Sequence, residues 1–372
     1  MGDTHHVTEP HGLAIIGLGN ISGAYLETIG RHPAIEIVAV ADLDRSRADA
    51  VAAEYGATAL DVAEAVAHPG VETVLNLTIP AAHAEVALAA IAAGRNVYGE
   101  KPLTKTLAEA DQVLAAAEAA GTRVGSAPDT VLGTGIQTAR AAVDDGMIGE
   151  PIAATASWFA PGHELWHPNP DFYYVDGGGP LLDMGPYYVT ALVHLLGPVV
   201  SVQGAASRRR DVRTIASGPR AGATIPVEVA THVTGVLEHA SGMLSTVTLS
   251  FDGVHSDAQS IEVHGTEGSL AVPDPNTFDG EVRLFRLGAS EWERLAPAAG
   301  FVDGSRGVGL LDFVATADGE SRAGGRLGRH VLEVMVELLA AADDGTRRRI
   351  HSTAERPQPM PLTPRATWGT PA

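Results

Sequence analysis

A lysine stands where an apolar segment ends, in Asn96-Val97-Tyr98-Gly99-Glu100-Lys101-Pro102. The carboxyl ends of the strands in an open α/β sheet border the crevice in which such sheets bind ligands. Proline fixes φ and lacks a backbone donor, so the strand ends at Pro102 and the lysine is held on a rigid turn. Lys101 could therefore share a proton with a substrate hydroxyl. Taken alone, the tripeptide Glu100-Lys101-Pro102 fits a solvated lysine at a strand end better than a catalytic one. The other motifs of the chain are needed to distinguish these two interpretations.

A second group of candidate residues follows three glycines, in the segment Gly177-Gly178-Gly179-Pro180-Leu181-Leu182-Asp183-Met184-Gly185-Pro186-Tyr187-Tyr188. Asp183 and Tyr187 are spaced i and i+4, so they share one face if this segment is helical. The carboxylate could bind substrate hydroxyls, and the phenol could exchange a proton with one of them. A nearby ammonium, such as that of Lys101, would stabilise the phenolate. The alternative is that Asp183 caps a helix and Tyr187 packs in a core.

A glycine turn, Gly17-Leu18-Gly19-Asn20-Ile21-Ser22, follows a buried apolar run and opens a helix. Gly17 allows the tight turn, and Gly19 lets the backbone approach a pyrophosphate, which would sit at the helix N-terminus formed by Asn20 and Ile21. Ser22 takes the place of the third glycine of the dinucleotide fingerprint and is small enough for close packing. The turn predicts a bound dinucleotide.

The loops that follow the other strands supply further candidate cofactor contacts. Asp42 ends the second strand roughly 20 residues beyond the turn, where an acid accepts hydrogen bonds from the ribose hydroxyls. Its charge would repel a 2′-phosphate, which favours NAD over NADP, although Arg45 could soften that preference. A capping or exposed role for His83 is at least as plausible as a cofactor contact. The remaining candidates are Thr78, Pro80, Glu100, Lys101 and Trp166.

The loop before the glycines is rich in rings, in Trp166-His167-Pro168 and Asp171-Phe172-Tyr173-Tyr174. Such rings stack on a sugar or nicotinamide, or else cover a domain interface. Substrate contacts are expected from His163, His167 and Tyr174, beside Lys101, Asp183 and Tyr187.

A basic cluster, Arg208-Arg209-Arg210 with Arg213 and Arg220, fits a solvated loop or an oligomer contact, with an anion site as the less favoured alternative. The chain has 15 histidines but no HExxH motif, no clustered carboxylates and no cysteine. The sequence therefore predicts no metal site.

Composition narrows the class of protein. A net charge of −20 argues against nucleic acid and anionic membrane surfaces as partners. No apolar run is long enough to span a membrane, and residues 1–11 lack a signal-peptide core, which predicts a cytoplasmic protein.

The arrangement of predicted elements indicates two domains. Short apolar strands alternate with alanine-rich helices over residues 12–128, which predicts a Rossmann domain with a doubly wound parallel sheet. Strands in succession over residues 129–350 predict an α+β domain with a large, open, mostly antiparallel sheet. The open face of such a sheet favours homo-oligomerisation through it. A Pro-rich tail, residues 353–372, is predicted to be extended or disordered. The predicted strands are 13–16, 35–41, 73–79, 96–99, 123–126, 152–159, 199–205, 227–239, 242–251, 260–264, 269–272, 281–287 and 291–295.

The motifs occur together in the order Gly17-Leu18-Gly19-Asn20, Glu100-Lys101-Pro102, the glycine segment with Asp183, and Gly265-Thr266-Glu267-Gly268. In this combination the chain resembles the Gfo/Idh/MocA family over about residues 12–342. The resemblance implies NAD(P)-dependent oxidation or reduction of a ring hydroxyl of a sugar, cyclitol or related polyol. It implies that Lys101 is the catalytic lysine and Asp183 the aspartate that orients the substrate.

The chain departs from the family pattern at two places. The usual Asp-x-Gly-x-His motif has Tyr187 in place of its histidine, as in some members, so a tyrosine–lysine pair is implied. An Asn-Arg pair that often follows the last Rossmann strand is replaced by Ala127-Pro128-Asp129-Thr130, which implies a different subfamily and substrate set.

Three functions are therefore weighed. The leading one is an NAD-dependent oxidoreductase that transfers a hydride between a ring hydroxyl of a sugar, glycoside or cyclitol and nicotinamide. The second is an NAD-dependent glycoside hydrolase that oxidises C3 transiently, eliminates the aglycone, adds water and re-reduces the sugar, with His163 or His167 as an extra base. The third is a non-catalytic NAD-binding sensor.

Overall fold

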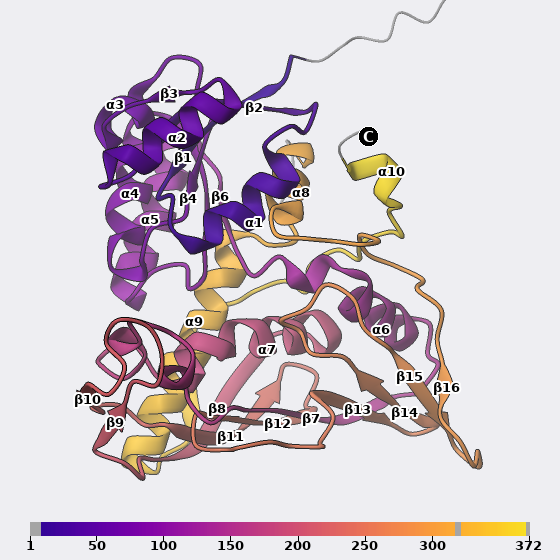
Figure 1. Ribbon diagram of the computed structural model, residues 1–372. Helices are drawn as coiled ribbons and strands as arrows, with labels where there is room; N and C mark the ends of the chain where they lie inside the picture. Colours follow the sequence, from indigo (N-terminus) through magenta and orange to yellow (C-terminus); the bar gives the residue numbers. More distant parts are fainter. Residues whose placement is uncertain (1–8, 317–320, 370–372) are drawn as a thin grey trace, which may run out of the picture. The chain divides into compact units, whose positions relative to one another are not determined.

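The computed structural model describes residues 9–316 and 321–369 (Figure 1). The chain divides into two compact units, the first within residues 1–129, 305–325 and 364–372, and the second formed by residues 130–304 and 326–363. Residues 1–8 and the last three residues of the tail lie outside the described residues.

The first unit contains a six-stranded, wholly parallel sheet in the order β3-β2-β1-β4-β5-β6. Its strands are apolar and buried, as β1 illustrates with Leu13 to Ile16 at most 1% exposed. Such continuous apolar runs are typical of parallel strands covered on both faces. The predicted Rossmann domain is confirmed. Its strands are β1 (His11–Ile16), β2 (Ile35–Ala41), β3 (Thr58–Ala59), β4 (Thr73–Asn76), β5 (Asn96–Gly99) and β6 (Val124–Ser126).

Helices connect these strands, and two helices from late in the chain join them in the same unit. The connecting helices are α1 (Asn20–Ile29), α2 (Arg45–Tyr55), α3 (Val62–Ala67), α4 (Pro80–Ala92) and α5 (Leu107–Ala120), and the late ones are α8 (Val308–Ala315) and α10 (Arg365–Trp368). The alanine-rich faces of α4 and α5 pack into the core beside β4 and β5.

The return of the chain to the first unit differs from the predicted domain boundaries. The ring of Phe313 in α8 packs edge-on against Tyr98 with 5.8 Å between centroids. Trp368 in α10 is 6% exposed, and its carbonyl oxygen lies 2.6 Å from His32 Nε2. Both contacts are with residues of the first unit, so the segments that carry these rings belong to that unit rather than to the second domain or a free tail.

The second unit is built on a nine-stranded sheet in the order β16-β15-β14-β13-β7-β12-β11-β8-β17. Its strands pair antiparallel except for β7 and β12, so the predicted large, mostly antiparallel sheet is confirmed. The strands are β7 (Pro151–Phe159), β8 (Val199–Ser207), β11 (His232–His239), β12 (Leu244–Ser250), β13 (Ile261–Gly265), β14 (Gly268–Val272), β15 (Arg283–Arg286), β16 (Glu293–Arg294) and β17 (Arg348–Arg349).

Helices α6 (Thr134–Asp144), α7 (Pro180–Leu196) and α9 (Gly325–Asp344) lie along one face of this sheet (Figure 1). On β11, Val233 and Leu237 are at most 2% exposed, whereas Val236, which points to the other face, is 41% exposed. The alternation shows that one face is packed under helices and the other is open, as antiparallel sheets allow.

Two local differences from the sequence prediction have physical causes. The predicted strand 73–79 is observed as β4, which ends at Asn76. It ends there because Asn76 Oδ1 accepts hydrogen bonds from the Thr78 hydroxyl (2.6 Å) and amide (3.2 Å). The predicted strand 227–239 begins only at His232, because the amides of Val227 and Glu228 donate to Asp211 O and Tyr174 O outside the sheet, and a separate hairpin of β9 (Val212–Thr214) and β10 (Thr224–Pro226) precedes them.

The tail is extended up to Pro364, but it is bound to the protein rather than disordered. Within the second unit, the Arg356 guanidinium donates to the carbonyl oxygens of His194 and Leu195, at 2.7 and 2.8 Å, and Met360 N donates to Gln137 Oε1 at 3.0 Å. Across residues 9–316 and 321–369, no helix combines the length and hydropathy needed to cross a membrane.

A buried histidine predicts loss of stability in acid. His330 in α9 is 0% exposed, its Nε2 accepts from Val199 N at 3.1 Å, and burial lowers its pKa from 6.5 to about 4. Between pH 6.5 and 4, His330 is therefore protonated in the unfolded chain but stays neutral in the folded one. The free energy of unfolding should fall as pH drops over this range, by up to about 3 kcal/mol.

Urea unfolding of the protein and of His330→Gln at several pH values measures this contribution. The variant should show a shallower decline over that range. His255→Gln, at a histidine whose side chain is 78% exposed, is the control and should follow the unsubstituted protein. Equal slopes for all three proteins would contradict the assignment.

Candidate functional site

The glycine turn of the first unit has the geometry that a dinucleotide needs. Gly17 has φ of 93°, and a Cβ there would lie 2.8 Å from the backbone of Leu77 and Thr78, so only glycine fits. A Cβ on Gly19, by contrast, would have no atom within 4 Å. Gly19 precedes α1 and, having no side chain, does not cap the helix, so no N-cap side chain occupies the end of the helix at which a phosphate would bind.

Asp42 stands beside this turn at the end of β2. Its Oδ2 accepts from Leu18 N at 2.6 Å, and its Oδ1 accepts from Asp44 N at 2.7 Å. The carboxylate is therefore fixed between the turn and the loop after β2. Arg45 instead donates to Asp49 Oδ1 at 3.0 Å and to Ala59 O at 2.8 Å, so its charge is directed to α2 and β3.

His83 is a buried link between two loops rather than an exposed or capping residue. It is 2% exposed, and its Nδ1 and Nε2 lie 2.8 Å from Pro102 O and 3.0 Å from Thr78 O. Because both nitrogens contact loop carbonyls, His83 positions the residues after β4 and β5. Of the other residues expected to contact the cofactor in this loop, Thr78 is half-buried and Pro80 is exposed.

Glu100 holds the strand end that carries Lys101. It is 8% exposed, its Oε1 accepts from the Tyr25 hydroxyl at 2.9 Å, and its Oε2 accepts from Lys101 N at 2.9 Å. Burial, together with the Glu100 charge, raises the pKa of Tyr25, which keeps the phenol a donor. Glu100 thus orients the lysine backbone, and Lys101 itself is half-buried.

A buried acid, Asp129, follows β6 in the same unit. Its Oδ2 accepts from Gly307 N at 2.7 Å and Gly309 N at 3.2 Å, and Arg306 lies 3.6 Å from its Oδ1. Burial raises the pKa of Asp129. In the sequence, Asp129 stands out only as a departure from a family motif. Its burial and its contacts are not visible there, because its partners lie far along the chain.

In the second unit, Asp183 and Tyr187 lie one turn apart on α7, as their spacing predicts. Asp183 Oδ2 is 2.8 Å from His163 Nε2, so the carboxylate binds a histidine instead of capping the helix. Tyr187 is 6% exposed. Gly179 precedes the helix with φ of 90°, and a Cβ there would lie 3.0 Å from Ala230 O.

The aromatic loop before the glycines is organised around His163. His163 is 7% exposed and lies in a short 3-10 helix, His163–Leu165, and its ring packs against Tyr173 and Phe251 with centroids 4.3 and 4.6 Å away. Trp166 is 60% exposed, and its indole donates to His163 Nδ1 at 3.2 Å. His167 is half-buried, its Nδ1 accepts from Asn169 N at 3.1 Å, and burial lowers its pKa.

Tyr174 does not have the place expected of a substrate-binding residue. Its side chain is 0% exposed, its hydroxyl donates to Glu164, and the same oxygen accepts from His163 N at 3.0 Å. Burial raises the pKa of this phenol. The expectation of a substrate contact was wrong because the hydroxyl is used inside the protein to hold the loop.

Arg213, assigned by sequence to a solvated basic cluster, is buried in an ion-pair network. Its Nη1 lies 2.7 Å from Glu164 Oε1 and its Nη2 lies 2.6 Å from Asp252 Oδ1, with its side chain 0% exposed. The guanidinium also lies 5.0 Å from the centre of the Tyr174 ring. The local feature that accompanies this burial is its position as the middle residue of a short hairpin strand, where it faces inward.

Two other arginines of the cluster form exposed pairs with carboxylates. Arg208 lies 3.2 Å from Asp211, and Arg220 lies 2.5 Å from Asp171. These pairs offset part of the positive charge that an anion site would use.

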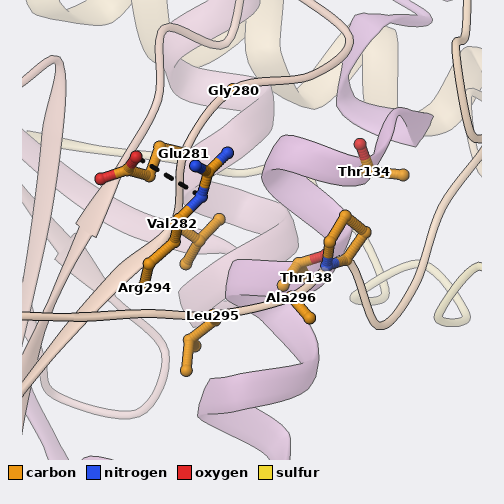
Figure 2. A pocket seen from close by; sticks show the side chains of 9 residues that line it. Thr134, Thr138, Gly280, Glu281, Val282, Arg294, Leu295 and Ala296 are labelled. Carbon is orange, nitrogen blue, oxygen red and sulfur yellow. Dashed lines mark ion pairs between the residues drawn. The ribbon is translucent and has the colours of Figure 1, made fainter.

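The second unit has a cavity of about 320 Å³ (Figure 2), and none of the predicted site residues lines it. The charged side chains that line it pair with each other, since Glu281 lies 3.5 Å from Arg294. Its lining comes from α6 and from the segments flanking β15 and β16, and consists of Thr134, Thr138, Gly280, Glu281, Val282, Arg294, Leu295, Ala296 and Pro297. A smaller cavity, of about 190 Å³, adjoins the glycines that precede α7.

A parallel sheet in Rossmann order with an open glycine turn, followed by a unit built on a large mixed sheet, defines a class of two-domain, dinucleotide-dependent oxidoreductases. Residues 12–127 match the family model described as "Oxidoreductase family, NAD-binding Rossmann fold", and residues 136–271 match the GFO/IDH/MocA C-terminal domain. The chain belongs to the Gfo/Idh/MocA family, and its first unit is an NAD-binding domain.

Curated relatives and a solved structure agree with this assignment. The chain is 30% identical to dTDP-3,4-didehydro-2,6-dideoxy-alpha-D-glucose 3-reductase of Streptomyces antibioticus, over 78% of this chain and 84% of the relative. It is 29% identical to 1,5-anhydro-D-fructose reductase of Ensifer adhaerens, over 69% and 74%. An NAD-binding oxidoreductase from Klebsiella pneumoniae shares the fold with a TM-score of 0.79 and 22% identity, over 92% of this chain and 100% of that one.

Proposed function

We propose that the protein transfers a hydride between a ring hydroxyl of a sugar, glycoside or cyclitol and the nicotinamide of NAD. The observation that carries the proposal is the pair Asp183 and Tyr187 on one face of α7, in a chain that also holds Lys101 at the end of a Rossmann strand. The two curated relatives described above are named as reductases of sugar carbonyls, which supports the substrate class.

The first unit offers the groups that would hold NAD. The open space at Gly19 and the first amides of α1, at Asn20 and Ile21, suit the pyrophosphate. Asp42 would accept hydrogen bonds from the ribose hydroxyls. Bound NAD supplies the site that accepts or gives the hydride.

The remaining residues handle the hydroxyl proton and the orientation of the sugar. Tyr187 takes the proton from the substrate hydroxyl during oxidation and returns it during reduction. The Lys101 ammonium stabilises the negative charge on the phenolate and on the substrate oxygen. Asp183, oriented by His163, accepts a hydrogen bond from a neighbouring hydroxyl.

A panel of sugars, glycosides and inositols, incubated with NAD, tests this proposal, and the matching keto sugars are tested with NADH. We expect a change in absorbance at the NADH band with at least one pair. Release of nitrophenol from a nitrophenyl glycoside without net NADH formation would favour the hydrolase instead. Tight NAD binding with no turnover across the panel would favour the sensor.

Asp42 predicts the choice of cofactor. Replacing it with serine removes the charge that opposes a 2′-phosphate and weakens the bonds to the ribose, so NAD affinity should fall about 10–100-fold while the NADP to NAD affinity ratio rises. Dissociation constants for both cofactors, measured by fluorescence, check this. The control is Asp44→Ser, two residues on, where the carboxylate caps α2. An unchanged cofactor ratio in Asp42→Ser would contradict the assigned role.

The open face of the nine-stranded sheet supports a homodimer or homotetramer. Exposed apolar side chains lie on this face, among them Val236 (41% exposed) and Leu244 (50%). A second copy would cover them. Light scattering after size-exclusion chromatography measures the mass, and a monomer at micromolar concentration would contradict the proposal.

A further inference from the structure

His163 has a hydrogen-bond partner at each ring nitrogen, and the two partners differ in kind. Its Nδ1 lies 3.2 Å from the indole nitrogen of Trp166, and its Nε2 lies 2.8 Å from Asp183 Oδ2. An indole N–H donates and never accepts. His163 Nδ1 must therefore carry the lone pair, which leaves the ring hydrogen on Nε2, directed at the carboxylate of Asp183.

The surroundings of the ring keep it in this orientation. It is held between Tyr173 and Phe251, with Trp158 at 6.1 Å between centroids. The backbone amide of His163 donates to the Tyr174 hydroxyl at 3.0 Å, so the chain is fixed as well as the ring.

The titratable groups around His163 come from four elements. Asp183 contacts it from α7, and Tyr173 packs on it from the second 3-10 helix, Asp171–Tyr173. His167 lies on the same loop. The carboxylate of Glu164, the residue after His163, is bound by Tyr174 and by Arg213 of β9. The charge of Glu164 is thus already paired with a guanidinium, and Asp183 is the carboxylate that accepts the hydrogen bond from His163.

We propose that Trp166 is a positioning residue that fixes His163 as a neutral donor, and that His163 in turn orients Asp183 toward a substrate hydroxyl. His163 then takes no part in proton transfer, because its Nε2 already carries hydrogen and its Nδ1 is covered by the indole. The inference rests on the proposed function for the role of Asp183. It excludes the use of His163 as an extra base in glycoside cleavage.

The first experiment reads the ring directly and needs no substrate. In protein labelled with ¹⁵N-histidine, long-range ¹H–¹⁵N spectra distinguish a ring with hydrogen on Nε2 from one with hydrogen on Nδ1 or on both. The His163 signals are assigned by their loss in His163→Gln. We expect the Nε2–H form in the unsubstituted protein at neutral pH, and a mixture of the Nε2–H and Nδ1–H forms in Trp166→Phe.

The matched control is Trp292→Phe, the same change at a ring that packs 5.4 Å from Phe285 in β15. It should leave the His163 signals unchanged. Hydrogen on Nδ1 in the unsubstituted protein, or an unaltered His163 spectrum in Trp166→Phe, would overturn the proposal.

The second experiment tests the consequence for Asp183 with a sugar that the protein turns over. Trp166→Phe should raise KM for the sugar about tenfold, with a smaller change in kcat. His163→Gln, whose amide can still donate to Asp183, should retain more sugar affinity than His163→Leu, which cannot. Equal KM values for these two His163 variants would refute the donor role. If no sugar is turned over by any protein, the proposed function fails, while the spectra still test the hydrogen-bond assignment.

Discussion

Replacing Lys101 with methionine is expected to lower kcat for sugar oxidation by about 10²–10⁴-fold, the range for losing a group that assists proton transfer. Methionine keeps the length of the side chain but removes the positive charge that the proposed function assigns to stabilising the substrate oxygen. Glu100 Oε2 accepts a hydrogen bond from the amide of residue 101, and the substitution keeps this backbone contact, so the strand end should keep its shape. Initial rates of NADH formation under saturating NAD measure the loss.

Lys105→Met is the matched control for this change. Lys105 is an exposed residue four positions further along the chain, and its variant should keep full activity. NAD affinity should stay within a few-fold in both variants, which would separate a loss of chemistry from a loss of cofactor. The proposed mechanism would be refuted if Lys101→Met turned over at nearly the original rate.

Replacing Arg213 with methionine should lower the free energy of unfolding by about 3–5 kcal/mol, the usual effect of removing one partner of a buried ion pair. Glu164 and Asp252 would lose the guanidinium that lies within 2.7 Å of each, and Glu164 would remain buried with an uncompensated charge. Urea unfolding followed by tryptophan fluorescence measures the effect. Trp158, Trp166 and Trp292 report on the second unit, in which they lie.

Arg220→Met removes an arginine from the same stretch of sequence and is the control. Its pair with Asp171 is exposed, with side chains 40% and 46% accessible, so the loss of stability should be much smaller than in Arg213→Met. The double variant Arg213→Met, Glu164→Gln should recover part of the stability because the stranded charge is gone. Similar losses for Arg213→Met and Arg220→Met would show that burial does not govern these pairs.

The first unit was largely predictable because its signals are local. An apolar strand, a glycine turn and an acid at the next strand end follow each other between Leu13 and Asp42, and each constrains the backbone within a few residues. The return of α8 and α10 could not be foreseen in this way. The contact between Tyr98 and Phe313 joins residues far apart in the sequence, and no periodicity marks it.

The same distinction applies to the site. The placement of Asp183 and Tyr187 on one face of a helix could be predicted, because residues four apart lie about one helical turn from each other. The partner of Asp183, His163, lies on a loop 20 residues earlier, and no spacing rule connects a loop to a helix face. Tyr174 and Arg213 were misassigned for the related reason that residue type alone does not distinguish a polar group that contacts a ligand from one buried against Glu164.

The path of the chain through the first unit has a consequence for biosynthesis. Ser126 N donates to Ala323 O, and α10, which carries Trp368, follows the whole of the second unit in sequence. A ribosome therefore releases the strands of the NAD-binding unit long before the segments that cover them. During that interval Tyr98 lacks its packing partner Phe313, and the first unit completes its fold only after α8 and α10 have been synthesised.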